Sequence, residues 1–352
     1  MKAVILAGGF GTRLRPLTLD LPKPIVPIFD RPFLYYQIDL LRKVPEIDEV
    51  ILSLNYRPER IEARVGNGTE AGLPVRYMVE PEPLGTGGAV KFASRGVEDT
   101  LLVFNGDVLT RIDLQEVIRR HHERTARATI VLTPVDNPSG YGLVESDEHG
   151  NVRRFLEKPP PDQVTCDTIN AGIYVLEPET FDRIPDGIPS SIERHYFPSL
   201  VTQGERFISY VDRGYWLDIG SPASYVRAHR DLMAQRCPEG PFHGQVSDFV
   251  YRADGCRIAR GAELQGPCFL GTGCVVENGA RIGPESVIGP RCIIRAGAVI
   301  EKAILWSDTV VDSGAEVHDA LLGESCRILS EAHIGPGVII GHRSVLSEHS
   351  RV

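Results

Sequence analysis

The chain has 352 residues, of which 42% are hydrophobic and 24% charged, a balance typical of a globular protein with room for two or more domains. Its formal net charge of −9 disfavours a general nucleic-acid-binding surface, so any basic phosphate site must be local. No signal peptide precedes the first strand and no apolar run approaches membrane-spanning length, so we expect a cytoplasmic protein with no membrane partner.

Strand-like and helix-like segments alternate along the N-terminal two thirds of the chain. The predicted strands are 2–7, 49–54, 74–79, 100–105, 127–135, 141–146, 151–157, 168–176 and 206–212. The predicted helices are 32–43, 57–65, 86–95, 113–125, 191–203 and 222–235, and two of them begin with capping residues, Asp113 and Ser221. Such alternation predicts an α/β fold, a Rossmann-like and mainly parallel sheet with helices on both faces, over a first domain of residues 1–235.

The pattern changes near residue 252. Aliphatic residues then recur every six positions, with two five-residue steps, at Ile258, Leu264, Leu270, Val276, Ile282, Ile288, Ile294, Ile300, Leu305, Val311, Val317, Leu322, Ile328, Ile334, Ile340 and Leu346. Because neither a helix nor an ordinary strand has this period, residues 252–352 are predicted to form a β-solenoid of hexapeptide repeats. Residues 236–251, rich in proline and glycine, are predicted to be a linker.

Cysteine usage follows the same repeat. The chain has seven cysteines without C-x-x-C spacing, which predicts neither zinc nor a disulfide framework. Five of them occupy the small-residue slot of the repeat, which lies four positions after most of the aliphatic residues: Cys256, Cys268, Cys274, Cys292 and Cys326. We interpret them as small buried hydrophobic residues rather than as metal or redox groups.

A glycine-rich segment follows the first predicted strand. It combines turn-forming glycines, free amide groups and fixed positive charge in Leu6, Ala7, Gly8, Gly9, Gly11, Thr12, Arg13 and, further on, Lys23. It is not a Walker A loop, since no Lys-Ser or Lys-Thr pair follows, and it is not a dinucleotide fingerprint, since Leu14 stands where the third glycine belongs. The segment predicts a phosphate site at the carboxyl edge of the sheet, although a simple glycine turn is the alternative.

Two aspartates are candidate metal ligands. Asp107 follows the strand 100–105, and Asp218 lies in an apolar stretch just before the last predicted helix. Mg²⁺ typically takes one or two carboxylates together with phosphate oxygens and water, so this pair predicts a magnesium site. A turn aspartate and a capping aspartate are the alternatives.

Polar residues also mark other predicted strands. Glu157 and Lys158 end one strand, where Lys158 could hold a second phosphate and Glu157 could contact hydroxyls. Asn170 and Gly172 interrupt another strand, and Tyr141-Gly142 begins a third. A polar side chain beside a glycine indicates a ligand that approaches the sheet closely. A surface ion pair and an ordinary turn are the alternatives.

Glu80 is followed by Pro83, Gly85 and further glycines at the start of a predicted helix. Glycines there can admit an anion or the face of a planar base. Because guanine offers two adjacent donors on its Watson–Crick edge, a carboxylate at Glu80 favours guanine. His121 and His122, in contrast, lie among arginines and are predicted to form a solvated helix face.

At this point the chain resembles the sugar-nucleotide pyrophosphorylases, also called NDP-sugar nucleotidyltransferases. The resemblance spans nearly the whole chain and rests on Gly8–Leu14 with Pro16 and Lys23, Asn105-Gly106-Asp107, Glu157-Lys158-Pro159, Asn170-Ala171-Gly172 and Trp216-Leu217-Asp218-Ile219-Gly220. Within the family, Glu80 and the loop after it look most like two-domain mannose-1-phosphate guanylyltransferases, which carry a C-terminal left-handed β-helix. The stretch Leu6–Gly9 is shared with thymidylyl-, uridylyl- and adenylyltransferases.

The resemblance implies a reaction between an NTP and a sugar 1-phosphate that releases pyrophosphate, most simply GTP with mannose 1-phosphate. It implies that Arg13 and the amides of Gly8–Thr12 bind the triphosphate, that Lys23 offsets charge at the reacting phosphates, and that Asp107 and Asp218 hold Mg²⁺. Lys158 would bind the sugar phosphate, the sugar hydroxyls would contact Gly142, Glu157, Asn170 and Gly172, and Glu80, Pro83 and Gly85 would contact the base. Assembly into a homo-oligomer through the β-helix is a further expectation.

Three alternatives remain open. The same reaction could use dTTP, UTP or ATP with glucose 1-phosphate. The chain could be a regulatory subunit, which the joint presence of Arg13, Lys23, Asp107, Lys158 and Asp218 disfavours. The solenoid could add acyl transfer, with His333 or His342 as the base.

Overall fold

The structure, a computed structural model, describes residues 1–237 and 245–352, and these divide into two compact units. The first unit contains Met1–Phe10, Pro22–Ile25 and Leu34–Asp218, and the second contains Gly11–Leu21, Val26–Phe33 and Ile219–Val352. The predicted boundary at residue 235 stays a prediction. Within the predicted linker, residues 238–244 lie outside the described residues.

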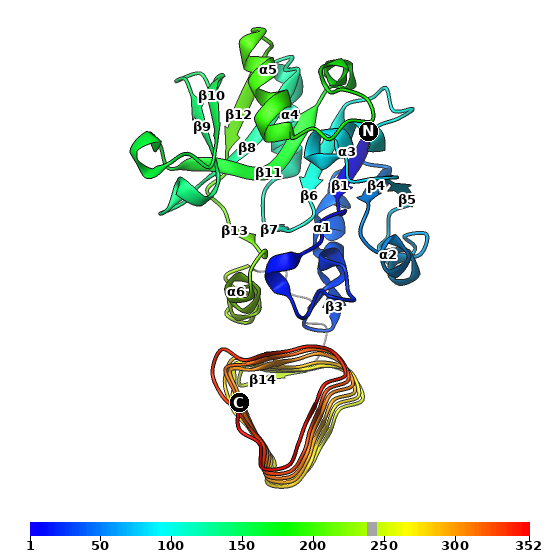
Figure 1. Cartoon of the computed structure of the whole chain (residues 1–352), viewed down its shortest axis with the longest axis vertical. Helices are drawn as coiled ribbons and strands as arrows, with labels where there is room; N and C mark the ends of the chain where they lie inside the picture. Colours follow the sequence, from blue (N-terminus) through cyan, green and yellow to red (C-terminus); the bar gives the residue numbers. More distant parts are fainter. Residues whose placement is uncertain (238–244) are drawn as a thin grey trace. The chain divides into compact units, whose positions relative to one another are not determined.

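The first unit is built on a nine-stranded sheet (Figure 1). Its strands are β1 (Lys2–Leu6), β4 (Glu49–Leu54), β5 (Val75–Val79), β6 (Leu101–Asn105), β8 (Ala128–Pro134), β9 (Gly142–Ser146), β10 (Val152–Glu157), β11 (Thr168–Leu176) and β12 (Phe207–Val211). Each strand begins and ends within one residue of its prediction, because each is an apolar run bounded by turn residues.

The order of the main path is β10-β9-β11-β6-β1-β4-β5, with β8 on β11 and β12 on β8. Strands β6, β1, β4 and β5 are parallel, as are β8 and β12, whereas β9, β10 and β11 pair antiparallel with their neighbours. The Rossmann-like α/β prediction is confirmed, with β11 as an antiparallel strand inserted beside the parallel group.

The described residues form six α-helices, of which α3, α4 and α5 pack against strands of the sheet and α6 belongs to the second unit. Their bounds are α1 Phe33–Leu41, α2 Pro58–Val65, α3 Gly85–Ala93, α4 Leu114–Glu123, α5 Phe197–Thr202 and α6 Pro222–Met233. Asp113 caps α4 by accepting from the amide of Glu116, and Ser221 forms a capping box with Ser224 at the start of α6, as their sequences predict. The predicted helix 191–203 is instead a π-helical turn, Ile192–Tyr196, that leads into α5.

Short elements escaped prediction because two- and three-residue strands leave no periodicity. They are the ribbon of β7 (Val108–Thr110) with β13 (Trp216–Asp218), the hairpin of β2 (Pro27–Ile28) with β3 (Arg31–Pro32), and the 3₁₀ turns Thr12–Leu14, Lys23–Ile25, Pro138–Gly140, Pro161–Gln163 and Pro178–Arg183.

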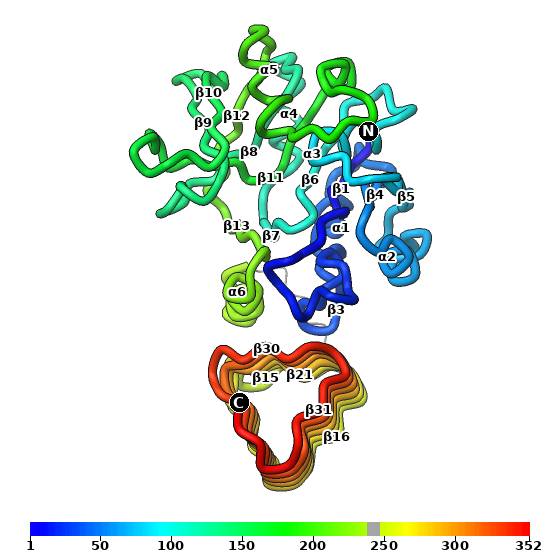
Figure 2. Tube along the Cα trace, in the orientation of Figure 1, coloured from blue at the N-terminus to red at the C-terminus, as the bar shows by residue number. Residues whose placement is uncertain are grey.

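The C-terminal part of the second unit is the predicted solenoid, a left-handed β-helix whose coils stack as a triangular tube (Figure 2). One side carries β14 (Gln245–Ser247), β15 (Val250–Arg252), β18 (Cys268–Leu270), β21 (Ser286–Ile288), β24 (Ile304–Leu305), β27 (Leu321–Leu322) and β30 (Ile339–Ile340). A second carries β16 (Arg257–Ile258), β19 (Val275–Val276), β22 (Ile293–Ile294), β25 (Val310–Val311), β28 (Arg327–Ile328) and β31 (Val345–Leu346). The third carries β17 (Glu263–Leu264), β20 (Arg281–Ile282), β23 (Val299–Glu301), β26 (Glu316–His318) and β29 (His333–Ile334).

The hexapeptide period explains the register of these sheets. Three hexapeptides make one coil, so Cys268 pairs with Ser286, 18 residues on. Each five-residue step shortens one coil, which is why Val287 pairs with Ile304. The aliphatic residues fill the tube, and Cys268, Cys274 and Cys292 are fully buried among them, which confirms that these cysteines act as small core residues.

Candidate active site

A cavity of about 350 Å³ opens at the carboxyl edge of β1, β4 and β6. Parallel strands bring their ends to the same edge, so residues distant in sequence meet there. The cavity lining includes every predicted nucleotide-binding residue that belongs to the first unit: Leu6, Ala7, Gly8, Gly9, Glu80, Pro83, Gly85 and Asp107. Lys23 lines it as well.

Two glycines of this edge have no room for a side chain. A Cβ on Gly8 would lie 3.1 Å from the amide nitrogen of Asn55 and 3.5 Å from Glu80 Oε1. A Cβ on Gly106 would collide with the carbonyl oxygen of Leu6, which accepts a 3.0 Å hydrogen bond from the amide of Gly106. Glycine therefore allows three strand ends to close around the cavity.

Glu80 is held rigidly at the cavity. Ser53 Oγ donates to Oε1 at 3.1 Å, the amide of Leu84 donates to Oε2 at 2.9 Å, and the residue is only 7% exposed. Burial raises the pKa of this carboxyl, and the two donated hydrogen bonds oppose that shift. The carboxyl group is thus fixed in orientation while it still contributes to the cavity wall.

Hydrogen bonds join the start of α3 to residues 190–193. Gly85 has φ +70°, and a Cβ there would lie 2.7 Å from the carbonyl oxygen of Ser190. That oxygen accepts from the amides of Gly87 (2.8 Å) and Gly88 (3.3 Å). Since these amides already have a partner, this helix start favours the face of a planar group over an anion.

Lys23 and the two predicted metal ligands converge on one point. Lys23 Nζ lies 2.7 Å from Asp107 Oδ2 and 3.7 Å from Asp218 Oδ1, and Lys23 is 8% exposed. The ribbon explains the convergence, because Asp218 pairs antiparallel with Val108, the residue after Asp107. Two carboxylates that already face a single positive charge are a donor set that suits a divalent cation.

Within residues 1–237 and 245–352 no group of three or more His, Cys, Asp or Glu side chains is placed to hold a metal. A pair of carboxylates leaves the remaining coordination positions to phosphate oxygens and water, which is the arrangement common for magnesium with phosphate substrates. Nucleotidyl transferases generally use a divalent metal ion.

The predicted sugar-binding residues lie on β9, β10 and β11, except Lys158, which directly follows β10. Gly142 pairs with Glu157 across β9 and β10, and a Cβ on Gly142 would lie 3.0 Å from Glu157 Oε2. Burial, followed by the negative charge of Glu193, raises the pKa of Glu157. Lys158 has φ +49° and an exposed side chain whose Nζ lies 3.9 Å from Glu157 Oε1.

Asn170 and Gly172 occupy a register shift in β11. The amide of Gly172 donates to Asn170 Oδ1 at 2.9 Å, and Gly172 has φ +75°. A Cβ on Gly172 would lie 2.9 Å from Asn105 Nδ2, so the bulge packs directly against the residue before Gly106-Asp107. Trp216 Nε1 donates to the carbonyl of Ala171 at 2.9 Å and thereby ties the bulge to β13.

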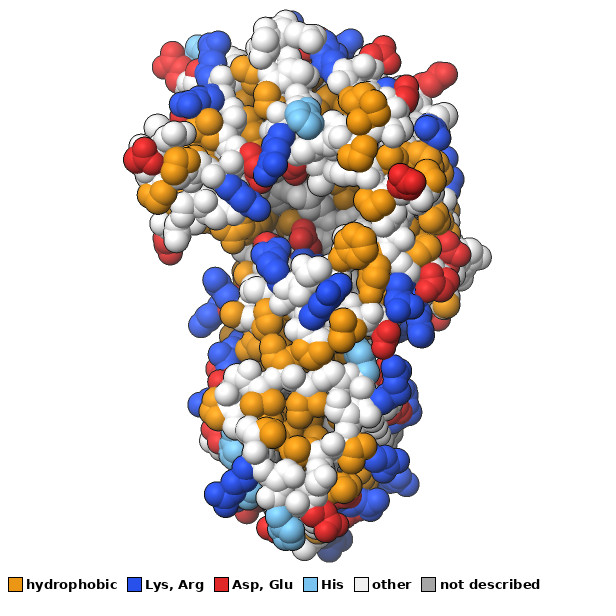
Figure 3. All heavy atoms as spheres, viewed as in Figure 1, with side chains coloured by type: hydrophobic (Ala, Val, Ile, Leu, Met, Phe, Trp, Pro, Cys, Tyr) orange, Lys and Arg blue, Asp and Glu red, His pale blue; other side chains and the backbone are white. Residues whose placement is uncertain are grey.

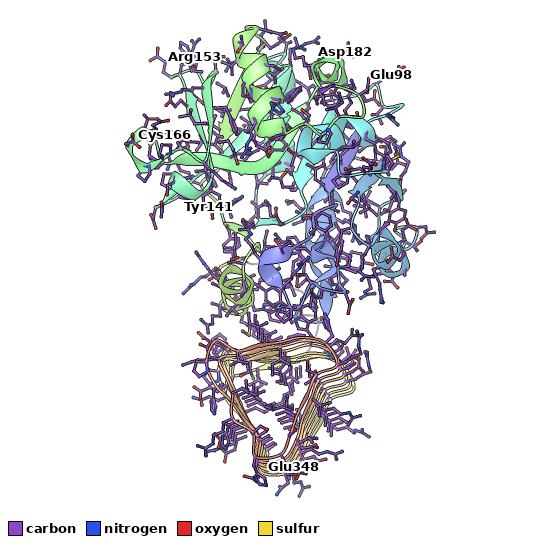
Figure 4. The ribbon with its side chains drawn as sticks, in the orientation of Figure 1. Glu98, Tyr141, Arg153, Cys166, Asp182 and Glu348 are labelled. Carbon is purple, nitrogen blue, oxygen red and sulfur yellow. The ribbon has the colours of Figure 1, made fainter. Side chains whose placement is uncertain are left out.

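Tyr141, the residue before β9, is labelled in Figure 4. Its ring lies edge-on to that of Trp216, with 5.7 Å between the ring centroids. The predicted sugar residues are therefore connected to the ribbon that carries Asp218.

Gly11, Thr12 and Arg13 belong to the second unit. Gly11 has φ +60° and precedes the 3₁₀ turn, and its carbonyl accepts from Thr18 Oγ1 at 2.7 Å. The triphosphate roles assigned to these three residues stay predictions.

Eight residues that line the cavity were not predicted to bind substrate: Phe10, Pro24, Ser53, Asn55, Thr86, Ala89, Asn105 and Gly106. Ser53 and Asn55 could have been found, because they are the polar residues at the end of the predicted strand 49–54, which is parallel to the first strand. The histidine interpretation needs a correction, since His121 is 1% exposed and its Nε2 lies 2.9 Å from Glu177 Oε1. Burial lowers the pKa of His121, so it is an interior residue, whereas His122 is exposed.

A larger cavity of about 790 Å³ lies elsewhere in the first unit, between β9 and β12. Its walls include Cys166, which Figure 4 also labels, and Tyr210. None of the predicted site residues lines it, so size alone does not identify the reactive site.

The chain matches the Nucleotidyl transferase family over residues 2–235 and the EIF2B subunit epsilon LbH domain over residues 247–352. It is 41% identical over 276 residues to a mannose-1-phosphate guanylyltransferase of Mycobacterium tuberculosis, covering 77% of this chain and 75% of that one. It is 35% identical over 368 residues to probable mannose-1-phosphate guanylyltransferase 2 of Arabidopsis thaliana, covering 99% and 98%.

Among solved structures, HddC from Yersinia pseudotuberculosis is similar with a TM-score of 0.57 and 31% identity, covering 66% of this chain and 99% of that one. A second structure of HddC, complexed with GMP-PN, is similar with the same TM-score and 32% identity. Among the described residues, no helix is long and apolar enough to cross a membrane. The cavity, the converging carboxylates and these likenesses agree, and the chain belongs to the Nucleotidyl transferase family.

Proposed function

We propose that this chain joins GTP and mannose 1-phosphate to give GDP-mannose and pyrophosphate, with Mg²⁺ as the divalent ion. The observation that carries the proposal is the pairing, in one cavity, of a clamped Glu80 with Lys23 and Asp107. The carboxylate of Glu80 suits guanine, which presents two neighbouring donors. Lys23 and Asp107 suit phosphates and their metal ion. The relatives that are named mannose-1-phosphate guanylyltransferases support the choice of substrates.

The reaction is a displacement at the α-phosphorus of GTP. An oxygen of mannose 1-phosphate attacks, the bond to the β-phosphate oxygen breaks, and pyrophosphate leaves. Because the attacking phosphate is already an anion, no general base is required. The protein must instead bring two polyanions together and stabilise the charge that develops.

Asp107 and Asp218 would hold Mg²⁺, which supplies positive charge to the phosphate oxygens. With the charge of these carboxylates offset by the ion, the ammonium of Lys23 would pair with a phosphate oxygen. Gly8 and Gly9, at the end of β1, would present their amides to the triphosphate, together with Gly11, Thr12 and Arg13 from the segment that follows.

The sugar phosphate would bind on the side of the site formed by β9, β10 and β11. Lys158 would pair with its phosphate, since the side chain is exposed. Its hydroxyls would contact Glu157, Asn170, Gly172 and the amide of Gly142. The contact of Gly172 with Asn105 supports this arrangement, because it brings β11 next to Gly106-Asp107.

The deciding experiment is a pyrophosphate-release screen of GTP, ATP, UTP and dTTP against mannose 1-phosphate and glucose 1-phosphate. We expect the highest kcat/KM with GTP and mannose 1-phosphate in the presence of Mg²⁺. A preference for another pair would keep the reaction and replace the substrates. Failure of every pair would favour the regulatory-subunit alternative.

The acyl-transfer alternative receives no support from the histidines concerned. His342 uses Nε2 to donate to the carbonyl of Leu17 and Nδ1 to accept from the amide of Glu324, so neither nitrogen is available as a base. His333 Nδ1 lies 3.3 Å from Glu316 Oε2.

We also propose that the chain forms a homo-oligomer through its β-helix. Figure 3 shows hydrophobic side chains at the C-terminal end of the tube. Val338, Ile340 and Leu346 there are only partly buried, and Val345 is 62% exposed. An open solenoid end of this kind needs a cover, and a second copy would supply one. Light scattering should give a mass of at least two chains, and a Val345→Asp change should lower it.

A further inference from the structure

The second unit joins parts of the chain that are far apart in sequence. It contains the β-helix and α6 together with two early segments, Gly11–Leu21 and Val26–Phe33. The four residues between those segments, Pro22–Ile25, belong to the first unit and include Lys23. Both covalent flanks of Lys23 therefore belong to the unit of the β-helix.

His342 of the β-helix fastens the segment before Lys23. Its Nε2 lies 2.8 Å from the carbonyl oxygen of Leu17, and its Nδ1 lies 3.0 Å from the amide nitrogen of Glu324. A carbonyl can only accept and an amide can only donate, so the ring carries its proton on Nε2 and accepts at Nδ1. One imidazole thus connects one coil of the β-helix to the early segment.

The surface beside His342 is shaped for this contact. The residues that follow β18, β21, β24, β27 and β30 form a column along the β-helix: Gly271, Gly289, Trp306, Gly323 and Gly341. A Cβ on Gly341 would lie 3.3 Å from Cβ of Pro16, so glycine leaves the space that Pro16 needs. Arg343 adds an exposed ion pair with Asp20, at 3.1 Å.

Trp306 is the large residue in this column, and it connects to the segment after Lys23. It is 3% exposed and its Nε1 donates to the hydroxyl of Tyr225 at 2.9 Å, while that hydroxyl donates to the carbonyl of Pro27. The ring of Trp306 also lies 5.2 Å from that of His342, centroid to centroid. The two anchors are therefore neighbours on the β-helix.

A second contact holds the same later segment. The amide of Phe29 donates to His229 Nε2 at 3.1 Å, and His229 Nδ1 lies 3.0 Å from the carbonyl of Tyr225. The ring of Phe29 packs against Phe269 of the β-helix, with 4.8 Å between centroids. Leu17 and Pro27, six residues before and four residues after Lys23, are thus both fixed.

We infer that His342 is a positioning residue for catalysis, which holds the segment from Gly11 to Lys23 in its working conformation through the carbonyl of Leu17. The inference rests on the proposed function, because it assigns catalytic value to Lys23 and to the segment before it. A displacement of about 1 Å in a group that contacts reacting atoms can lower a rate by roughly 100-fold. The β-helix therefore contributes to turnover although it supplies no group to the reaction.

Two substitutions separate this role from simple packing. In His342→Gln the side-chain amide can occupy the place of Nε2 and still donate to Leu17. In His342→Asn the side-chain oxygen can replace Nδ1 and accept from Glu324, but the side chain is too short to reach Leu17. We expect H342N to lower kcat by about 10- to 100-fold with KM values changed less than about threefold, and H342Q to keep kcat within about threefold of the original.

Hydrogen exchange supplies a second readout that does not depend on turnover. Peptides that cover residues 11–25 should exchange faster in H342N than in the original protein, while H342Q should match the original. His333→Asn is the control, because His333 lies on another side of the β-helix beside Glu316. It should change neither readout.

The outcomes separate the two proposals. If no substrate pair is turned over, the proposed function fails, and the exchange data still decide whether His342 orders residues 11–25. If H342N matches the original protein in both readouts, or if H342Q is as impaired as H342N, the positioning role of the bond to Leu17 is overturned.

Discussion

The cavity edge of the sheet and the interior of the β-helix are built from opposite kinds of residue. The cavity holds charged groups that face one another: Lys23 with Asp107 and Asp218, and Glu80 between two donors. The interior of the β-helix is formed by aliphatic, alanine and cysteine side chains, without a charged residue in the cluster of described residues that forms it.

Glycine residues also have different structural roles in the two regions. At the cavity, Gly8 and Gly106 allow strand ends to approach each other. In the β-helix, glycines such as Gly273 and Gly297 take positive φ values of 71° and 72° at corners, where other coils place Arg291 or Asp308 in the same left-handed conformation. In these two regions, charges that face one another accompany the candidate site, whereas repeated apolar residues form the supporting core.

The largest effect should come from removing one of the converging carboxylates. Asp107→Asn keeps the size of the side chain but removes the charge that pairs with Lys23 and would hold the metal. We expect the kcat of pyrophosphate release to fall by about 1,000-fold, comparable to the loss of a group that stabilises developing charge. The melting temperature should change little, since Asp107 is partly exposed.

Asp99→Asn is the matched control for this change, because Asp99 is exposed and remote from the cavity lining. It should leave kcat within about twofold, as expected for an exposed surface substitution. Turnover by the Asp107→Asn protein close to that of the control would show that Asp107 does not hold the metal.

The β-helix should respond in the opposite way. Ile294→Ala removes a fully buried side chain from the interior of the tube, and such deletions cost about 2–5 kcal/mol of unfolding free energy. Denaturant unfolding should report that loss, while the kcat of the folded protein should change by less than about threefold. Thr272→Ala, at an exposed position of the β-helix, should cost no more than about 0.5 kcal/mol. A large fall in kcat for Ile294→Ala without loss of stability would contradict this division of roles.

Prediction from sequence succeeded where a pattern is local and long. Apolar runs defined the nine strands of the main sheet, and the period of six defined the interior of the β-helix. The meeting of Gly8, Glu80 and Asp107 at one cavity also follows from the sequence, because parallel strands end at a common edge.

Other features left no local signal. The ribbon that brings Asp218 beside Asp107 consists of two three-residue strands, too short for a periodicity. The contact of Leu17 with His342 joins residues 325 positions apart. The prediction for His121 was wrong because arginines surround it in the sequence, although His121 itself lies on the buried face of α4.

His229, a buried titratable residue of the second unit, predicts a smaller effect, on the pH dependence of the unfolding free energy. His229 is 1% exposed, and burial lowers its pKa from 6.5 to about 4. The folded state therefore keeps it neutral, and the stability that this provides is present above pH 6.5 and is lost as the pH falls toward 4. From pH 7 to pH 5 the loss should be about 2 kcal/mol, at about 1.4 kcal/mol per pKa unit.

A comparison of the original protein with two histidine variants separates the contribution of His229 from those of other titrating groups. His229→Gln should remove most of the decline in unfolding free energy between pH 7 and pH 5, whereas His149→Gln, at an exposed position, should leave it unchanged. Equal slopes for the original protein and His229→Gln would mean that His229 is not the group that titrates.

The smallest expected effect comes from substitution of Glu80, which tests whether a buried charge at the cavity selects the base. In Glu80→Gln one carboxylate oxygen becomes an amide donor, which cannot accept from guanine. Ser53 can accept from this donor, whereas the amide of Leu84 cannot. We expect the ratio of kcat/KM for GTP over ATP to fall by about tenfold, the lower end of what a hydrogen bond to a charged group contributes. Glu82→Gln, two residues on and exposed, should leave the ratio unchanged. If Glu80→Gln lowers kcat/KM equally for both nucleotides, Glu80 shapes the cavity without reading the base, and selection of guanine must come from backbone groups of the loop before α3.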